Sequence, residues 1–289
     1  KTLIEEYNKI SSIPETVDPS ENCNPFDTKE DWIQKKLGIK KFKVRQDGKV
    51  DVDGRVLLYE SGLKEIPVKF GNVSGDFNCH SNYLRNLKNC PDFVGGDFTC
   101  SNNLINTLEF LPSKIEGKFL CRDNQLESIK NLKNCDIGGE IYLRSNYINS
   151  LDGAPKRVFG DFDVSWNNIT NLRGCPDHID GSLLLFNNEI ETISNFPKLV
   201  RDYVDISSNN IHNLDGIPEN TNFNCEFIMD DNPIWEILDI FQDSLSKKDR
   251  EIDLELLQSL KEWDAIQDKT VIWDRLIEVF YDFEIDPPK

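Results

Sequence analysis

The sequence lacks long apolar runs, has fewer basic than acidic residues, and contains little methionine or histidine. Its 289 residues include one Met and three His, and 33 Lys and Arg stand against 51 Asp and Glu, a formal net charge of −18. No segment approaches the roughly 18 apolar residues that a membrane-spanning helix needs. The acidic balance argues against non-specific binding to nucleic acid or anionic lipid, because phosphate contacts need Lys and Arg. The first residues have no apolar segment of the kind found in signal peptides.

What the sequence does contain is a repeat of about 21 residues, which has to be recognised before any fold is assigned. Each unit has a Gly, an apolar residue two positions later, a second apolar residue after one spacer, and then an Asn. That Asn recurs at Asn82, Asn103, Asn124, Asn146, Asn167, Asn188 and Asn209. Weaker copies occur around Leu58 and Met229, so we count about nine units.

The full unit reads apolar-x-apolar-x-x-Asn-x-apolar-x-x-apolar, followed in most copies by a Pro turn and a Gly. This is the leucine-rich-repeat pattern, with Phe and Cys in place of two leucines. We therefore expect a leucine-rich-repeat solenoid of short parallel strands, whose alternate side chains point inward. The rest of each unit should return as extended or 3₁₀ segments. The buried Asn amide should bond to backbone groups of the turn that would otherwise lack partners.

The eight cysteines separate into core and undecided positions. Cys79, Cys100 and Cys121 occupy a strand slot that other units fill with Leu, Val, Ile or Met, and Cys90, Cys135 and Cys175 share a slot before the turn. A slot that exchanges Cys with aliphatic residues is a core slot, where Cys acts as a small hydrophobe. We therefore expect buried free thiols and a reducing, intracellular compartment. Cys23 and Cys225 lie outside these slots and stay undecided.

Three regions follow from these patterns. Residues 1–54 form an expected N-terminal cap with a capping box at Thr28, a helix over 32–37 that ends at Gly38, and a hairpin around Gly48. Residues 55–232 form the solenoid. Residues 233–289 form an expected helical C-terminal cap, with helices beginning after Pro233 and including Ile266 and Val271. Residues 230–289 hold 17 acidic and seven basic residues, a net charge of −10.

One stretch of repeat carries a resemblance to a known family. Residues 90–105 read Cys-Pro-Asp-Phe-Val-Gly-Gly-Asp-Phe-Thr-Cys-Ser-Asn-Asn-Leu-Ile. This resembles the Cys-Pro-x-x-Val-x-Gly-Asp-Phe-x-Cys-Ser-x-Asn-x-Leu repeats of the uncharacterised leucine-rich-repeat proteins of large tailed bacteriophages. The array entry at 66–77 and the exit at Asn232-Pro233-Ile234 look similar as well. The resemblance implies a phage-encoded protein that acts in the cytoplasm of an infected bacterium, and it supplies no activity or catalytic residues.

Patterns that would indicate catalysis or metal binding are weak. His80, His178 and His212 are scattered, and His80 is expected to be a solvated side chain on the strand face. The sequence has no phosphate-binding Gly loop and no Cys-x-x-Cys or His-Glu-x-x-His spacing. Residues 47–54 resemble a calcium loop but lack its ligand order and final Glu. We expect no enzymatic activity, no cofactor and no metal.

The outward face of the parallel sheet is the most informative surface, because solenoids present such a face as a concave binding surface. Polar residues dominate its columns, except in the middle units, where aromatic and aliphatic side chains lie beside arginines, as in protein-binding hot spots. The candidate binding residues are Leu120, Arg122, Tyr142, Arg144, Asp163, Trp166, Leu184 and Phe186. An acidic ladder comprises Asp76, Asp97, Glu140 and Asp161.

The expected function is a non-enzymatic scaffold that binds or inhibits a host protein, such as a defence component, through the concave face. One alternative is an acidic mimic of nucleic acid that occupies a DNA-binding protein through the ladder and the acidic C-terminal region. Another is a structural component of the virion. No membrane and no direct nucleic-acid contact is expected, and the sequence leaves the oligomeric state open.

Overall fold

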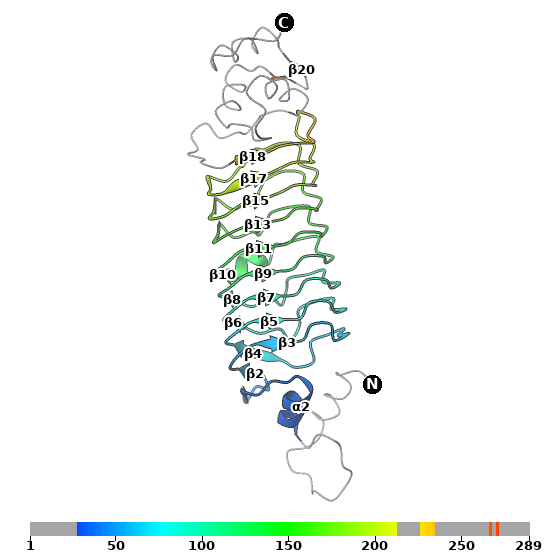
Figure 1. Cartoon of the computed structure of the whole chain (residues 1–289), viewed down its shortest axis with the longest axis vertical. Coiled ribbons are helices and arrows are strands. Elements are labelled where there is room, and N and C mark those ends of the chain that lie inside the picture. Colours follow the sequence, from blue (N-terminus) through cyan, green and yellow to red (C-terminus); the bar gives the residue numbers. More distant parts are fainter. Residues whose placement is uncertain (1–27, 213–225, 235–265, 268–269, 272–289) are drawn as a thin grey trace, which may run out of the picture. The chain divides into compact units, whose positions relative to one another are not determined.

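A computed structural model describes residues 28–212, 226–234, 266–267 and 270–271, which form a parallel β-solenoid. Contacts between successive turns join residues 21 positions apart, which confirms the repeat length. The chain divides into two compact units, residues 1–126 with 131–139 and residues 127–130 with 140–289. Within each unit the strands stack in chain order (Figure 1). In the described part of the chain, no helix is long and apolar enough to cross a bilayer.

The first unit contains one described helix, a hairpin and two ladders of short strands. Helix α2 (Lys29–Lys36) is followed by an antiparallel hairpin of β1 (Phe42–Val44) and β2 (Val50–Val52). The hairpin extends into a parallel ladder of β4 (Phe70–Val73), β6 (Phe93–Val94), β8 (Lys114–Ile115) and β10 (Asp136–Ile137). The other ladder has the order β3 (Val56–Leu57), β5 (Phe77–Asn78), β7 (Phe98–Thr99) and β9 (Phe119–Leu120). A 3₁₀ turn spans Leu132–Asn134.

The second unit repeats this arrangement. One ladder has the order β11 (Ile141–Tyr142), β13 (Phe162–Asp163), β15 (Leu183–Leu184), β17 (Tyr203–Asp205) and β18 (Glu226–Ile228). The other has the order β12 (Arg157–Val158), β14 (His178–Ile179) and β16 (Leu199–Val200). The turns that contain β13, β15 and β17 therefore give one strand to each ladder, and the return segments expected as extended or 3₁₀ structure form a second parallel ladder that the repeat pattern did not predict. A β-branched residue two positions before each repeated Gly, as at Val94 and Ile115, is the signal for it.

The conserved position of Asn in each unit has a structural explanation. Asn167 Oδ1 accepts a hydrogen bond from the Ile148 amide at 2.9 Å, and its Nδ2 donates to the carbonyl oxygens of Val164 at 3.0 Å and Leu143 at 3.2 Å. Ile148 and Leu143 belong to the preceding turn, so the amide joins two turns as well as closing its own strand. The same pair of offsets, 19 and 24 residues, occurs at Asn82, Asn103, Asn124, Asn188 and Asn209.

The core of the first unit is a column of aromatic rings and thiols. Phe77 stacks on Phe98 with ring centroids 5.5 Å apart, and Phe98 stacks on Phe119 at 5.8 Å. The strand slot that exchanges Cys with aliphatic residues is buried, as predicted, and Cys79 and Cys100 are fully enclosed there. The described cysteines, which form no disulfide, are Cys79, Cys90, Cys100, Cys121, Cys135 and Cys175.

The N-terminal elements follow the prediction, whereas part of the C-terminal prediction is wrong. Thr28 Oγ1 accepts the Asp31 amide at 3.1 Å and caps α2, and Gly38 adopts a φ of +68° just beyond it. Ile266 and Val271, which were predicted to lie in helices, instead pair in an antiparallel ladder of β19 (Ile266–Gln267) and β20 (Thr270–Val271). β-Branched residues favour such extended pairing. Ile234, expected to begin a helix, is a buried residue of a turn, whereas Cys23, Cys225 and residues 235–265 and 272–289 lie outside the described residues.

Replacing a ladder asparagine should destabilise the solenoid far more than replacing its exposed neighbour. Asn167→Ala leaves the buried Ile148 N–H without its acceptor, and the Val164 and Leu143 carbonyls each lose one of the two side-chain donors that they have. An unsatisfied buried N–H costs about 1–3 kcal/mol and each further lost hydrogen bond about 0.5–1.5 kcal/mol, so we expect a loss of about 2 kcal/mol or more. The adjacent Asn168 is exposed, and Asn168→Ala should change the stability by less than about 0.5 kcal/mol. Urea unfolding of both variants measures the difference, and equal losses would contradict the joining role of Asn167.

The buried thiols should make the protein unstable in alkali. Burial raises the pKa of the Cys135 thiol to about 12, and it raises those of Cys79, Cys90, Cys100 and Cys175 as well. Their contribution to stability is complete below the unfolded pKa, about 8.5, and is lost above it because only the unfolded state releases the proton. Each such thiol should lower the free energy of unfolding by about 1.4 kcal/mol per pH unit in that range.

Urea unfolding under reducing conditions at about pH 8 and pH 10 measures this slope. A Cys79→Val/Cys100→Val variant removes two of the raised thiols, so its slope should be smaller by about 2.7 kcal/mol per pH unit. A slope identical to that of the parent would show that these thiols do not govern the alkaline loss.

Candidate protein-binding face of the second unit

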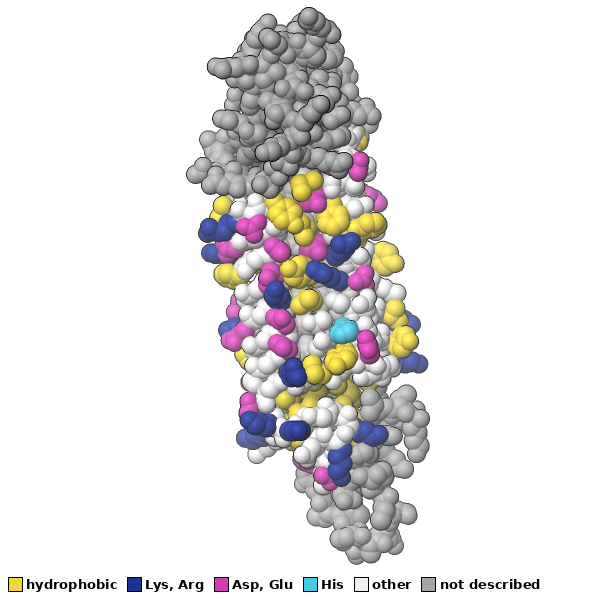
Figure 2. All heavy atoms as spheres, viewed as in Figure 1, with side chains coloured by type: hydrophobic (Ala, Val, Ile, Leu, Met, Phe, Trp, Pro, Cys, Tyr) yellow, Lys and Arg dark blue, Asp and Glu magenta, His cyan; other side chains and the backbone are white. Residues whose placement is uncertain are grey.

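The outward side of β11, β13, β15 and β17 is called here the strand face. Parallel pairing places Tyr142, Asp163, Leu184 and Asp205 side by side in one row across these four strands. Two residues further along each strand, Arg144 and Phe186 lie in the next row. Figure 2 shows hydrophobic side chains gathered with basic and acidic ones over this part of the second unit. Leu120 and Arg122, also candidate residues, lie in the first unit, where both are half-buried.

The arginine and two of the aromatic residues are held by specific contacts. The Arg144 guanidinium lies over the Phe186 ring, 5.2 Å from its centroid, while the Arg144 side chain remains exposed. A cation over an aromatic face is attracted by the ring quadrupole. The Tyr142 hydroxyl donates to Asp161 Oδ2 at 3.1 Å. Of the predicted arginines and aromatic residues, Arg144 and Phe186 are therefore in direct contact.

Asp163 has a different position from the one predicted. It is only 3% exposed, and its Oδ1 accepts from the Ser165 amide at 3.1 Å and from the Ser165 hydroxyl at 2.5 Å. Asp205 and Ser207 repeat this arrangement in a later turn, with distances of 3.0 and 2.6 Å. These carboxylates bond to backbone at the point where each strand ends, so Asp163 contributes to local structure and presents little surface to a partner.

Trp166 has a backbone conformation that does not suit its side chain. It is 50% exposed and has a φ of +55°. The residue before each ladder Asn occupies this left-handed position, and in other turns it is Ser81, Asn102, Asp123, Ser145, Asn187, Ser208 or Asp231. Left-handed backbone costs an L-residue roughly 1–2 kcal/mol, and Asn and Asp tolerate it best. A bulky aromatic there is unfavourable for the fold, and such local strain is typical of functional positions.

The structure adds exposed aromatics that were not selected from the sequence. Tyr203 in β17 is 37% exposed, and partial burial, followed by the charges of Asp161 and Asp205, raises its pKa. In the first unit, the exposed Tyr59 stacks on the half-buried His80 with centroids 5.3 Å apart. His80 therefore packs against a ring and is not the fully solvated side chain that was expected. Tyr59 belongs to the weakest of the early copies, which is why the repeat pattern did not mark it.

The acidic ladder takes part in joining the turns. The Oδ1 atoms of Asp76, Asp97 and Asp161 accept the amides of Asp97, Lys118 and Ser182 in the next turn, at 3.0, 2.8 and 2.9 Å. The Gly before each donating amide leaves room for this carboxylate. A Cβ at Gly96 would lie 2.2 Å from Asp76 Oδ1, and one at Gly117 would lie 2.3 Å from Asp97 Oδ1. The repeated Gly-Asp pair is therefore a joint between turns, and three ladder carboxylates each use one oxygen in it.

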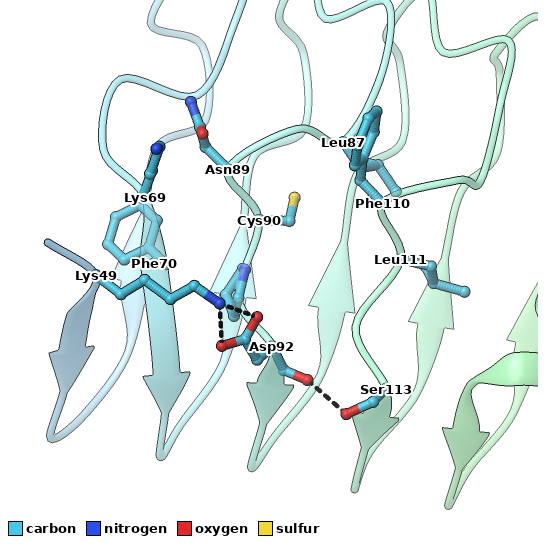
Figure 3. Close-up of a pocket in the computed structure, with 11 residues that line it drawn as sticks. Lys49, Lys69, Phe70, Leu87, Asn89, Cys90, Asp92, Phe110, Leu111 and Ser113 are labelled. Carbon is cyan, nitrogen blue, oxygen red and sulfur yellow. Dashed lines mark hydrogen bonds and ion pairs between the residues drawn. The ribbon is translucent and has the colours of Figure 1, made fainter. Parts of the chain in front are cut away.

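A cavity of about 600 Å³ lies on the first unit (Figure 3). Phe70, Leu87 and Cys90 line its buried part. The Lys49 ammonium contacts both Asp92 carboxylate oxygens at 2.8 and 2.7 Å, as the dashed lines show. Burial raises the pKa of the Cys90 thiol, so it stays protonated near neutrality. In this cavity Lys49 is therefore ion-paired with Asp92, and the Cys90 thiol lacks the thiolate form that a nucleophile needs.

Comparison with known proteins gives no functional assignment, because no protein-family model and no curated protein matches the chain. Within the described residues, no group of three or more His, Cys, Asp and Glu is placed to hold a metal ion. The class that the fold defines is a parallel β-solenoid, and the candidate site is the strand face of its second unit.

If Trp166 serves binding more than folding, its removal should be tolerated. In Trp166→Asn the relief of left-handed strain offsets the packing lost from the buried half of the ring, so we expect stability within about 1 kcal/mol of the parent. Phe162→Ala, in the core below the same face, should lose about 3–5 kcal/mol. Urea unfolding compares the two variants. A loss above about 2 kcal/mol in Trp166→Asn would indicate that the indole supports the fold.

Proposed function

We propose that this chain is a leucine-rich-repeat protein that binds another protein through the strand face of its second unit and has no catalytic activity of its own. The repeat identity is supported by the apolar-x-apolar-x-x-Asn pattern and by the parallel strands that carry it. The α2 helix and the β1–β2 hairpin are proposed to cap one end of the array, and residues 233–289 the other.

The observation that carries the binding proposal is the exposed Trp166 in a left-handed position. Its amide donates to the Phe186 carbonyl at 2.9 Å, which places it next to the Arg144–Phe186 pair, and the exposed Tyr203 belongs to β17 of the same ladder. Trp, Tyr and Arg are the residues most enriched in interface hot spots, because they combine a large apolar area with polar groups at one end. A solvated strand face needs none of them.

The proposed setting rests on the resemblance to phage repeat proteins. The chain would be phage-encoded and would bind or inhibit a host protein, such as a defence component, in the cytoplasm of an infected bacterium. The described cysteines form no disulfide, which is consistent with a reducing compartment. The alternative of a nucleic-acid mimic is less well supported, because Asp76, Asp97 and Asp161 use carboxylate oxygens within the fold.

Comparative capture from a bacterial lysate tests the proposal. A partner retained by the parent should be lost by Tyr142→Ala/Phe186→Ala and by Trp166→Asn. It should be retained by Tyr147→Ala, which removes a tyrosine that is 56% exposed and lies outside the strand rows. Capture that survives in the double variant would exclude this face as the binding surface.

Salt separates this proposal from the mimic. Contacts between apolar and aromatic groups persist when charges are screened, so the complex should survive about half-molar salt, where the Debye length is only a few ångströms. A complex that forms in low salt and disappears under those conditions would support the acidic mimic instead.

A further inference from the structure

The outward side of the second ladder of the second unit is called here the return face. Its charged side chains are mostly basic, unlike those of the acidic ladder. Register pairs Arg157 with His178 and Leu199 across β12, β14 and β16. Two residues beyond each of these lie Phe159, Asp180 and Arg201, and one residue before them lie Lys156, Asp177 and Lys198. Four basic side chains and two acidic ones therefore share this small area, which makes it locally positive on a chain of net charge −18.

Asp180 fixes two of the arginines at once. Arg157 Nε and Nη2 donate to Asp180 Oδ2 at 3.0 and 2.7 Å, and Arg201 Nε donates to Oδ1 at 2.9 Å. The Asp180 side chain is 19% exposed, whereas those of Arg157 and Arg201 are 52% and 57% exposed. The two guanidiniums, Arg157 first, hold the pKa of Asp180 below its usual range, so the carboxylate stays charged and both arginines remain bound to it.

An exposed aromatic ring completes the cluster. The Arg157 guanidinium lies 5.0 Å from the centroid of the Phe159 ring, which is 52% exposed. A guanidinium has five N–H donors in a planar fork. Arg157 uses two of them and Arg201 one in the contacts with Asp180, and donors therefore remain to contact an anion from outside.

The stability of the fold does not explain this arrangement. Ion pairs between exposed side chains contribute little to folding, because water and salt screen them and ordering both side chains costs entropy. Corresponding positions of the first unit differ: Lys114 pairs with Glu116, and Asp92 pairs with Lys49 and Arg45 of the hairpin, but no strand position there holds an arginine. The pair of arginines is therefore a local feature of one surface and not a property of the repeat.

We propose that the return face of the second unit is a docking surface for an acidic protein segment. The arginine patch, defined as Arg157, Phe159, Asp180 and Arg201, binds carboxylates of that segment through the free guanidinium donors. Asp180 is a positioning residue that orients both forks, and Phe159 contacts apolar parts of the same segment. Arginine forks match the geometry of carboxylates, and pre-orientation reduces the entropy lost on binding. This site is independent of the strand face.

Fluorescence anisotropy with a fluorescein-labelled octaglutamate peptide, at low salt and neutral pH, tests the proposal on the full chain. We expect saturable binding by the parent and at least a ten-fold weaker affinity in Arg157→Gln/Arg201→Gln. A control, Lys130→Gln/Arg173→Gln, removes the same charge elsewhere on the second unit and should bind within about two-fold of the parent. Urea unfolding should show that all variants remain folded, since only exposed pairs are lost.

Asp180→Asn separates oriented arginines from diffuse positive charge. It adds one positive charge to the patch, so a merely electrostatic surface would bind the peptide more tightly. Loss of orientation instead predicts affinity several-fold weaker than that of the parent. Tighter or unchanged binding by Asp180→Asn, equal weakening in the control variant, or preferential binding of a labelled single-stranded oligothymidylate would each overturn the proposal.

Discussion

The hydrogen bonds of the ladder asparagines are the constraint on which the solenoid depends. A two-residue strand cannot satisfy the backbone groups at its end, and burying them without partners would cost more than a short ladder contributes. One primary amide in each turn has a donor and an acceptor, and it reaches its own turn and the one before it. Asn167 illustrates this with contacts to Val164, Leu143 and Ile148. The repeat length follows, because these offsets hold only if every turn has nearly the same number of residues.

The Gly-Asp joint is a second connection between turns, and it limits what the acidic ladder can do. Asp97 both donates its amide to Asp76 and accepts the Lys118 amide, so the same residue links three turns. A carboxylate used in this way needs a Gly beside it in the next turn, as the position of Gly117 shows. Charge that looks available in the sequence is therefore partly engaged in the structure. Residues that recur from turn to turn, such as the Gly-Asp pair, are needed for the fold. Residues that vary between turns contribute little to it.

The repeat length, the core slots, the buried thiols and the N-terminal hairpin could all be predicted, since each depends on local pattern or on exchange between equivalent positions. The second parallel ladder was missed because each of its strands has a single buried residue, such as Val94 or Ile115, whereas the strands of the other ladder are marked by two alternating apolar residues, such as Phe98 and Cys100. The burial of Asp163 was missed because it depends on a bond to Ser165 and on neighbouring turns, neither of which the alternation of a strand encodes. Ile266 and Val271 were misplaced because apolar spacing alone does not distinguish a helix from a short β-pair.

The left-handed position before each ladder Asn explains how a uniform solenoid acquires specific surfaces. The side chain at this position is exposed or half-buried in every described turn, so it can change without repacking the core. Ser145 and Asn187 suit that geometry, and Trp166 does not. A similar argument applies to the return face. The exposed positions of Arg157 and Arg201 hold other residue types in other turns, whereas the neighbouring core position always holds a buried aliphatic residue such as Val158, Ile179 or Val200. In both places the fold supplies rigid spacing between turns, and departures from the repeat, more than the repeat itself, indicate where a partner would bind.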